Sequence, residues 1–124
     1  MNSIKITIPF PIPPQEKPRI GKYGNFYSPT SGFCRDLQIY ISGQMRLKRY
    51  IRLEGDIIIS GNVYYSGKKA GDLDHILSTL LDSLKKVVFK DDAQVMGIER
   101  FYIMENSGQD CVVLEIRSAM DLTK

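Results

Sequence analysis

Residues 71–88 read GDLDHILSTLLDSLKKVV and carry the strongest periodic signal in this chain. Apolar side chains recur there every three or four residues, so they form one stripe along a helix that faces a core. The stripe consists of Leu73, Ile76, Leu77, Leu80, Leu81, Leu84, Val87 and Val88. The pattern predicts a helix of about 16 residues, roughly 24 Å long at 1.5 Å per residue.

Strand patterns lie on both sides of this helix. Residues 3–8 alternate isoleucine with polar side chains, which is typical of a half-buried strand. Further strands are predicted over 56–65, with Gly61 as a possible bulge, and over 95–104 and 111–117. Residues 106–109 predict a hairpin turn between the last two strands.

The remaining segments complete the predicted order. Apolar spacing predicts a second helix over 33–50, and the prolines of residues 9–32 predict a long loop. The order strand, loop, helix, strand, helix, strand, strand indicates an α/β fold of the α+β type. We expect a small mixed sheet of about four strands packed with two main helices.

Composition sets the outer limits. The chain has 124 residues, which predicts one domain over 1–124, and 43% of them are hydrophobic, which is typical of a globular protein. No apolar run is long enough to cross a membrane, and the N-terminal residues do not resemble a signal peptide. Cys34 and Cys111 match no zinc spacing, so we expect free thiols in a cytoplasmic protein.

Charge is divided unevenly along the chain. Residues 1–50 hold eight Lys or Arg and two acids, whereas residues 51–124 hold nine Lys or Arg and twelve acids. The two halves could attract each other, or cations could serve a polyanion and carboxylates a metal, or the charges could simply be solvated. Arg46, Lys48 and Arg49 suit the negative end of the predicted 33–50 helix.

Two aspartate pairs stand at the two ends of the strong helix. Asp72 and Asp74 begin it, and Asp91 and Asp92 follow it. As structural residues they would cap the helix or form a turn. As a functional group they would supply the oxygen ligands that Mg²⁺ prefers, since clustered carboxylates repel each other until a cation binds. The pairs meet only if the chain folds back after Asp91.

These residues resemble a known family. The segments 71–77, 80–84 and 89–95 look like the core of the RusA family of Holliday junction resolvases, and Lys17-Pro18-Arg19 with Tyr27-Ser28-Pro29 is similar to its basic loop. The resemblance implies a homodimeric endonuclease, dependent on Mg²⁺ or Mn²⁺, that cleaves four-way DNA junctions in recombination and repair. It places the catalytic acids at Asp72, Asp74 and Asp92, with Asp91 as a further metal ligand.

The sequence departs from the family pattern at three positions. His75 replaces an asparagine, Ser78 replaces a lysine, and Gly71 replaces a basic residue. One hypothesis is therefore an active resolvase, and the alternative is a RusA-like junction-binding protein that cuts weakly or not at all. A protein-interaction domain is the third option. The residues expected to contact DNA are Lys17, Arg19, Lys22, Lys68 and Lys69.

Overall fold

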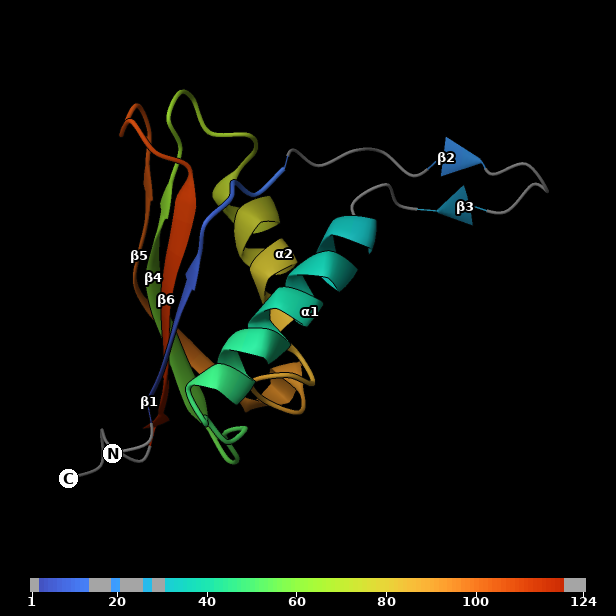
Figure 1. The fold of residues 1–124 in the computed structure, drawn as a ribbon, viewed down its shortest axis with the longest axis vertical. Coiled ribbons are helices and arrows are strands. Elements are labelled where there is room, and N and C mark those ends of the chain that lie inside the picture. The colour runs from blue at the N-terminus through green and yellow to red at the C-terminus, as the bar shows by residue number, and fades with distance from the viewer. Residues whose placement is uncertain (1–2, 14–18, 21–25, 28–30, 120–124) are drawn as a thin grey trace.

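The computed structural model describes residues 3–13, 19–20, 26–27 and 31–119, and it confirms the predicted α+β fold (Figure 1). The strands are β1 Ser3–Ile8, β2 Arg19–Ile20, β3 Phe26–Tyr27, β4 Ile57–Tyr64, β5 Val95–Met104 and β6 Cys111–Ser118. The helices are α1 Ser31–Leu47, α2 Leu73–Leu84 and the short 3-10 helix η1 Asp92–Gln94. The short pair β2–β3, which is antiparallel, interrupts the segment predicted as continuous loop.

The four long strands form one mixed sheet in the order β1-β6-β4-β5. Strand β6 is antiparallel to both β1 and β4, whereas β4 and β5 run parallel. The predicted hairpin between β5 and β6 is therefore wrong, because β4 lies between them. The turn residues were identified correctly, but a turn signal does not reveal which strand lies next to which.

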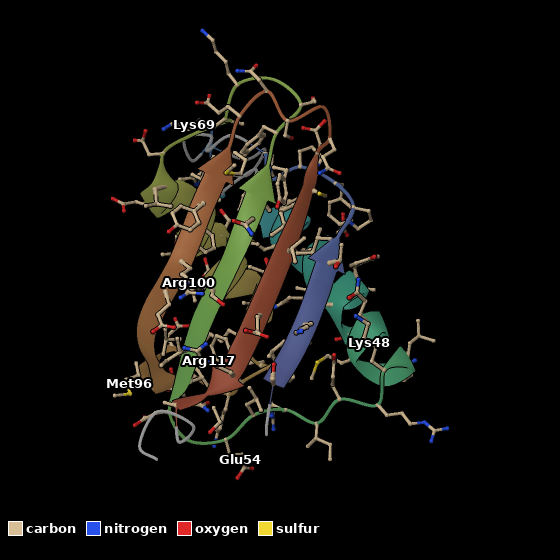
Figure 2. All side chains as sticks on the ribbon, turned by 90° about the vertical axis from the view of Figure 1, so that its left-hand side faces the viewer. Lys48, Glu54, Lys69, Met96, Arg100 and Arg117 are labelled. Atoms are coloured by element: carbon tan, nitrogen blue, oxygen red, sulfur yellow. The ribbon has the colours of Figure 1, made fainter. Side chains whose placement is uncertain are left out.

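Both helices cover the same face of the sheet, and Figure 2 views the other face, which is bare. The isoleucines of β1 lie on the covered face, where they pack with α1 and α2 into one core. Because no helix among the described residues covers the other face, several large apolar side chains of edge strand β5 are exposed. They are Met96, Ile98, Tyr102 and Met104.

Three local features differ from or refine the predictions. Helix α2 ends at Leu84, because Lys86 adopts a left-handed backbone with φ 70°, yet Val88 still reaches the core. The register of β4 and β5 shifts beside Gly61, as expected of a bulge. A Cβ at Gly61 would lie 2.4 Å from the Val113 carbonyl oxygen, so this position requires glycine.

Two expectations from composition are met. Cys34 and Cys111 are both free thiols. Within residues 3–13, 19–20, 26–27 and 31–119, no helix combines the length and apolar character that a membrane crossing requires.

Candidate functional site at the start of α2

Two loops meet where α2 begins. The loop before the helix is bound to the loop between β5 and β6 by main-chain and side-chain hydrogen bonds. Lys69 donates its N–H to the Glu105 carboxylate at 2.9 Å, and Asn106 donates to the Gly67 carbonyl at 2.8 Å. Asp110 accepts from the Ser66 N–H at 2.8 Å. These contacts hold the chain that leads into Asp72.

Tyr65 ties the N-terminal segment to the same place. Its side chain is buried, and its hydroxyl donates to the Ile12 carbonyl at 3.0 Å. Burial raises the pKa of Tyr65, an effect that the Ala70 N–H partly opposes and the charge of Asp110 reinforces. The phenol therefore stays protonated and keeps donating to Ile12.

His75 makes the second contact with this segment. Its Nε2 lies 3.0 Å from the Pro13 carbonyl oxygen, so this nitrogen carries the proton and donates it. Residues 9–13 are thus fixed beside the start of α2. No sequence pattern predicts this contact, because Pro13 is distant from His75 along the chain.

Gly71 explains one departure from the family pattern. Its φ is 129°, a conformation that L side chains rarely adopt, and a Cβ there would lie 3.0 Å from Cδ2 of His75. A basic residue at position 71 would be strained by the backbone and crowded by the imidazole. The presence of His75 and the absence of a cation at 71 are therefore linked.

Asp72 and Asp74 present open carboxylates at this end of the molecule. Asp72 occupies the N-cap position with an extended backbone, but its side chain makes no capping hydrogen bond, and Asp74 lies in the first turn. Both are exposed, and neither has a hydrogen-bond or ion-pair partner among the residues that the structure describes. The positive end of the helix dipole eases the repulsion between them.

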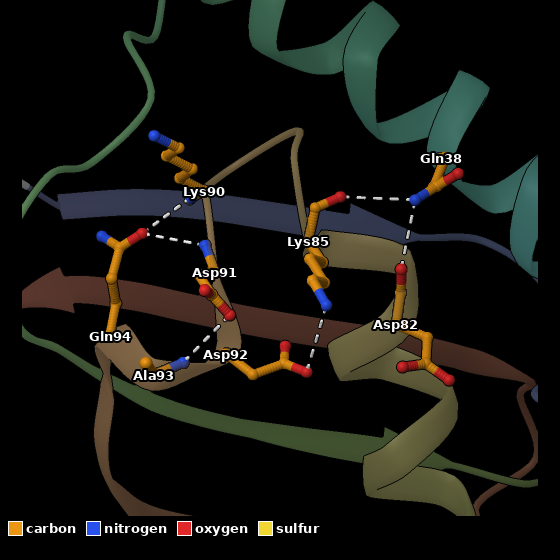
Figure 3. Close-up of polar contacts among 8 residues, drawn as sticks. All are labelled: Gln38, Asp82, Lys85, Lys90, Asp91, Asp92, Ala93 and Gln94. Atoms are coloured by element: carbon orange, nitrogen blue, oxygen red, sulfur yellow. Dashed lines mark hydrogen bonds and ion pairs between the residues drawn. The ribbon is translucent and has the colours of Figure 1, made fainter.

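Asp91 and Asp92, which follow α2, have different interaction partners (Figure 3). Asp91 accepts from the Ala93 N–H at 3.4 Å as the cap of η1, while Gln94 Oε1 accepts from the N–H groups of Lys90 and Asp91. Asp92 forms an ion pair instead, with its carboxylate 3.8 Å from Nζ of Lys85. Asp91 is thus a structural cap, and Asp92 faces a cation.

The two aspartate pairs do not meet within one chain. Asp72 and Asp74 stand at the start of α2, a helix of about 18 Å, whereas the Lys85–Asp92 pair follows its last turn. Across the described part of the chain, no three His, Cys, Asp or Glu side chains come close enough to hold a metal ion. The chain does fold back, but it is the end of β5, not Asp92, that returns to the start of α2.

The structure describes only some of the residues that are predicted to contact DNA. Lys68 and Lys69 are exposed just before Asp72 and form no ion pair with any described residue. Lys17 and Lys22 lie outside the described residues, and Arg19 is described only as part of β2. Ser78 is exposed one turn beyond Asp74. Sequence reasoning missed Tyr65, because a side chain that binds distant main chain leaves no local pattern. It also missed Gln94, although the spacing of Asp91 and Gln94 matches a capping box.

The amino-acid sequence is similar to that of a known protein family. The family model described as "Endodeoxyribonuclease RusA" matches residues 9–117. The match covers most of the chain and includes both aspartate pairs. A search of curated proteins finds no match.

Proposed function

This chain belongs to the RusA family of endodeoxyribonucleases, a family that resolves Holliday junctions, and from that premise we propose a metal-dependent resolvase. The observation that supports this function best is the open pair Asp72 and Asp74. Two exposed carboxylates, with no partner among the described residues, stand at a helix start shortly after Lys68 and Lys69. Cations hold phosphates while acids hold a metal, and both are needed at a scissile phosphate.

The donor set of the pair fits Mg²⁺ or Mn²⁺. Such ions are commonly bound by one or two carboxylates, with waters and substrate phosphates completing the shell. Asp72 and Asp74 offer oxygen ligands that no described side chain or N–H group occupies. A bound ion would polarise the phosphate and lower the pKa of a bound water.

The chain's own residues would position the DNA. In the proposal, Lys68 and Lys69 contact phosphates beside the cut and fix the register of the strand. Asp72 and Asp74 repel those phosphates when no cation is present, so metal and DNA bind cooperatively. Tyr65 and His75 hold Ile12 and Pro13 beside this end. In the proposal, the basic residues that follow in the sequence, Lys17, Arg19 and Lys22, contact further phosphates.

A second copy of the chain completes the proposal. Paired cuts in a four-way junction require two sites, which a symmetric homodimer supplies. Edge strand β5 offers unpaired main chain together with the exposed side chains of Met96, Tyr102 and Met104, a surface suited to such a partner. In this proposal Asp92 keeps its predicted catalytic role by acting at the site of the second chain.

Cleavage of a labelled four-way junction tests the function. With Mg²⁺ we expect wild-type protein to cut, and Asp72→Asn and Asp74→Asn to lower the rate by at least about 100-fold, since metal assistance is worth several kcal/mol. The matched control is Asp82→Asn, an exposed aspartate on the same helix. Cleavage that is equal in wild type and in Asp74→Asn would remove the pair from the mechanism.

The alternative function is junction binding with weak or no cutting. The observation that favours it is the exposed Ser78, because α2 carries no Lys or Arg along its whole length. If Ser78→Lys raises the cleavage rate at unchanged junction affinity, a missing cation limits this chain. Efficient cutting by wild type at nanomolar protein would exclude the alternative.

A further inference from the structure

A basic groove lies between α1 and the turn that follows α2, at the end of this helix opposite Asp72 and Asp74. Its volume is about 580 Å³, and its lining includes Arg35, Gln38, Ser42, Arg46 and Lys86. Gln38 bridges the two walls, because its Nε2 donates to the carbonyls of Asp82 and Lys85 at 3.1 and 3.3 Å (Figure 3). This contact joins the two walls of the groove and also satisfies two carbonyls at the end of α2.

Among the described residues, no ion pair neutralises the basic side chains of the groove. Arg35, Arg46 and Lys86 are exposed and form no ion pair within the described residues. Arg35 and Arg46 are eleven residues apart, so they lie on one line along α1, about 16 Å apart along the axis. The helix contains a single acid, Asp36.

Helix dipoles explain only part of this charge. Arg46 lies in the last turn of α1, where a cation is favoured. Arg35 lies in the second turn of the same helix, where the dipole does not favour a cation. The dipole interpretation of the basic residues at the end of α1 therefore does not extend to the groove as a whole.

The backbone conformation at Lys86 shows which substitution can test the groove. Lys86 has φ 70° just after α2, and Arg49 has φ 56° just after α1. Helices usually place glycine in this conformation, and another residue costs about 1 kcal/mol there. Arg52 adds a further cation, since its Nη1 donates to the Lys86 carbonyl at 3.2 Å. Replacing Lys86 with glycine therefore removes the charge without adding backbone strain.

We propose that this groove binds the phosphate backbone of a duplex DNA arm. The inference rests on the proposed function, because it adds a contact site to the same junction substrate. Lys86 and the pair Asp72 and Asp74 stand at opposite ends of α2, about 18 Å apart. At roughly 3.4 Å per phosphate along one strand, the groove contacts the arm about five nucleotides from the cut made at Asp72 and Asp74 of the same chain.

The test measures junction affinity at several salt concentrations in the Asp74→Asn background, which prevents cutting. We expect Lys86→Gly to lower affinity about 3- to 10-fold at moderate salt and to reduce the salt slope by about 0.9. Arg35→Gln with Arg46→Gln should reduce the slope by about twice as much. Thermal stability of Lys86→Gly should stay the same or rise, because glycine relieves the strained backbone.

The control is Lys5→Gln. Lys5 is an exposed cation of β1 that points away from the buried isoleucines, outside both the groove and edge strand β5. It should leave affinity and slope unchanged. Wild-type affinity and slope in both groove variants would overturn the proposal, as would an equal loss in Lys5→Gln.

The outcomes separate this inference from the proposed function. Normal binding by the groove variants, with cleavage still abolished by Asp74→Asn, rejects the groove and retains the nuclease. Weakened binding by Lys86→Gly, in a protein whose wild type never cuts, supports the groove and rejects the nuclease. A loss confined to single-stranded DNA, with duplex arms unaffected, would exclude a duplex as the occupant.

Discussion

At the scale of single residues, the start of α2 is organised by side chains that bind main chain rather than each other. Tyr65 holds Ile12, and His75 holds Pro13, so two residues far along the sequence fix the base of the N-terminal segment. Neither hydrogen bond involves the carboxylates of Asp72 and Asp74. The consequence is an anchored loop beside an open acid pair.

Tyr65→Phe tests the anchor. Loss of the hydroxyl should lower the free energy of unfolding by about 1 kcal/mol at pH 7, the usual net value of one hydrogen bond. Because burial raises the pKa of Tyr65 above 10.0, the native state keeps its proton where the unfolded state loses it. Stability therefore falls as pH rises past about 10, and the variant should lack this part of the fall.

Urea unfolding between pH 7 and 11 provides the measurement for Tyr65→Phe. Tyr102→Phe, at a side chain that is 57% exposed, is the control and should follow wild type. An alkaline loss in Tyr65→Phe as steep as that of wild type would show that this phenol is not responsible.

At the scale of elements, the connection from α2 to β5 depends on Gln94. Its Oε1 accepts from Lys90 and Asp91, and its Nε2 donates to the carbonyls of Leu53 at 3.1 Å and Gly55 at 2.8 Å. One side chain thus joins η1 to the segment before β4. Asp91 is the reciprocal partner in this capping box.

Gln94→Ala should therefore destabilise the fold by about 1–2 kcal/mol, since four hydrogen bonds to main chain are lost in a largely exposed site. Gln94→Glu keeps the acceptor and loses the donor, so its melting temperature should fall between those of wild type and Gln94→Ala. Asp92→Asn should change stability little, because its pair with Lys85 is a surface ion pair. A larger loss in Asp92→Asn than in Gln94→Ala would contradict these assignments.

At the scale of the whole molecule, the two predicted acid pairs are separated by the length of α2. A site that unites them requires a second chain. Strand β5, at the edge of the sheet with apolar side chains exposed, is the surface that the proposal assigns to this partner. The dimer and the complete site are then one hypothesis.

Mixing two inactive variants tests that hypothesis. Asp74→Asn and Asp92→Asn should each abolish cutting alone, but a mixed dimer contains one site with Asp74 from one chain and Asp92 from the other. Nicking should therefore return to a fraction of the wild-type rate after the subunits exchange. If both aspartates act within one chain, every site in the mixture keeps a defect and no activity returns.

Much of the fold follows from local patterns. The isoleucines of β1 and the leucines of α2 recur with the periods of a strand and a helix, so the type and the buried face of each element could be predicted. The end of α2 could not, because Val87 and Val88 continue the apolar pattern although the backbone has already turned at Lys86. Apolar residues in a turn can pack into a core just as those in a helix can.

For the candidate site, the amino-acid sequence determined the residue types: carboxylates at the start of a helix, cations just before them, and the family motif that links them. Only the packed chain determined which of these residues are neighbours. The parallel pairing of β5 with β4 leaves Asp92, which precedes β5, at the far end of α2, and the contact of α1 with the turn at Lys86 forms a basic groove. Periodicity records which face of an element is buried, whereas the pairing of distant elements depends on the shape of the whole core.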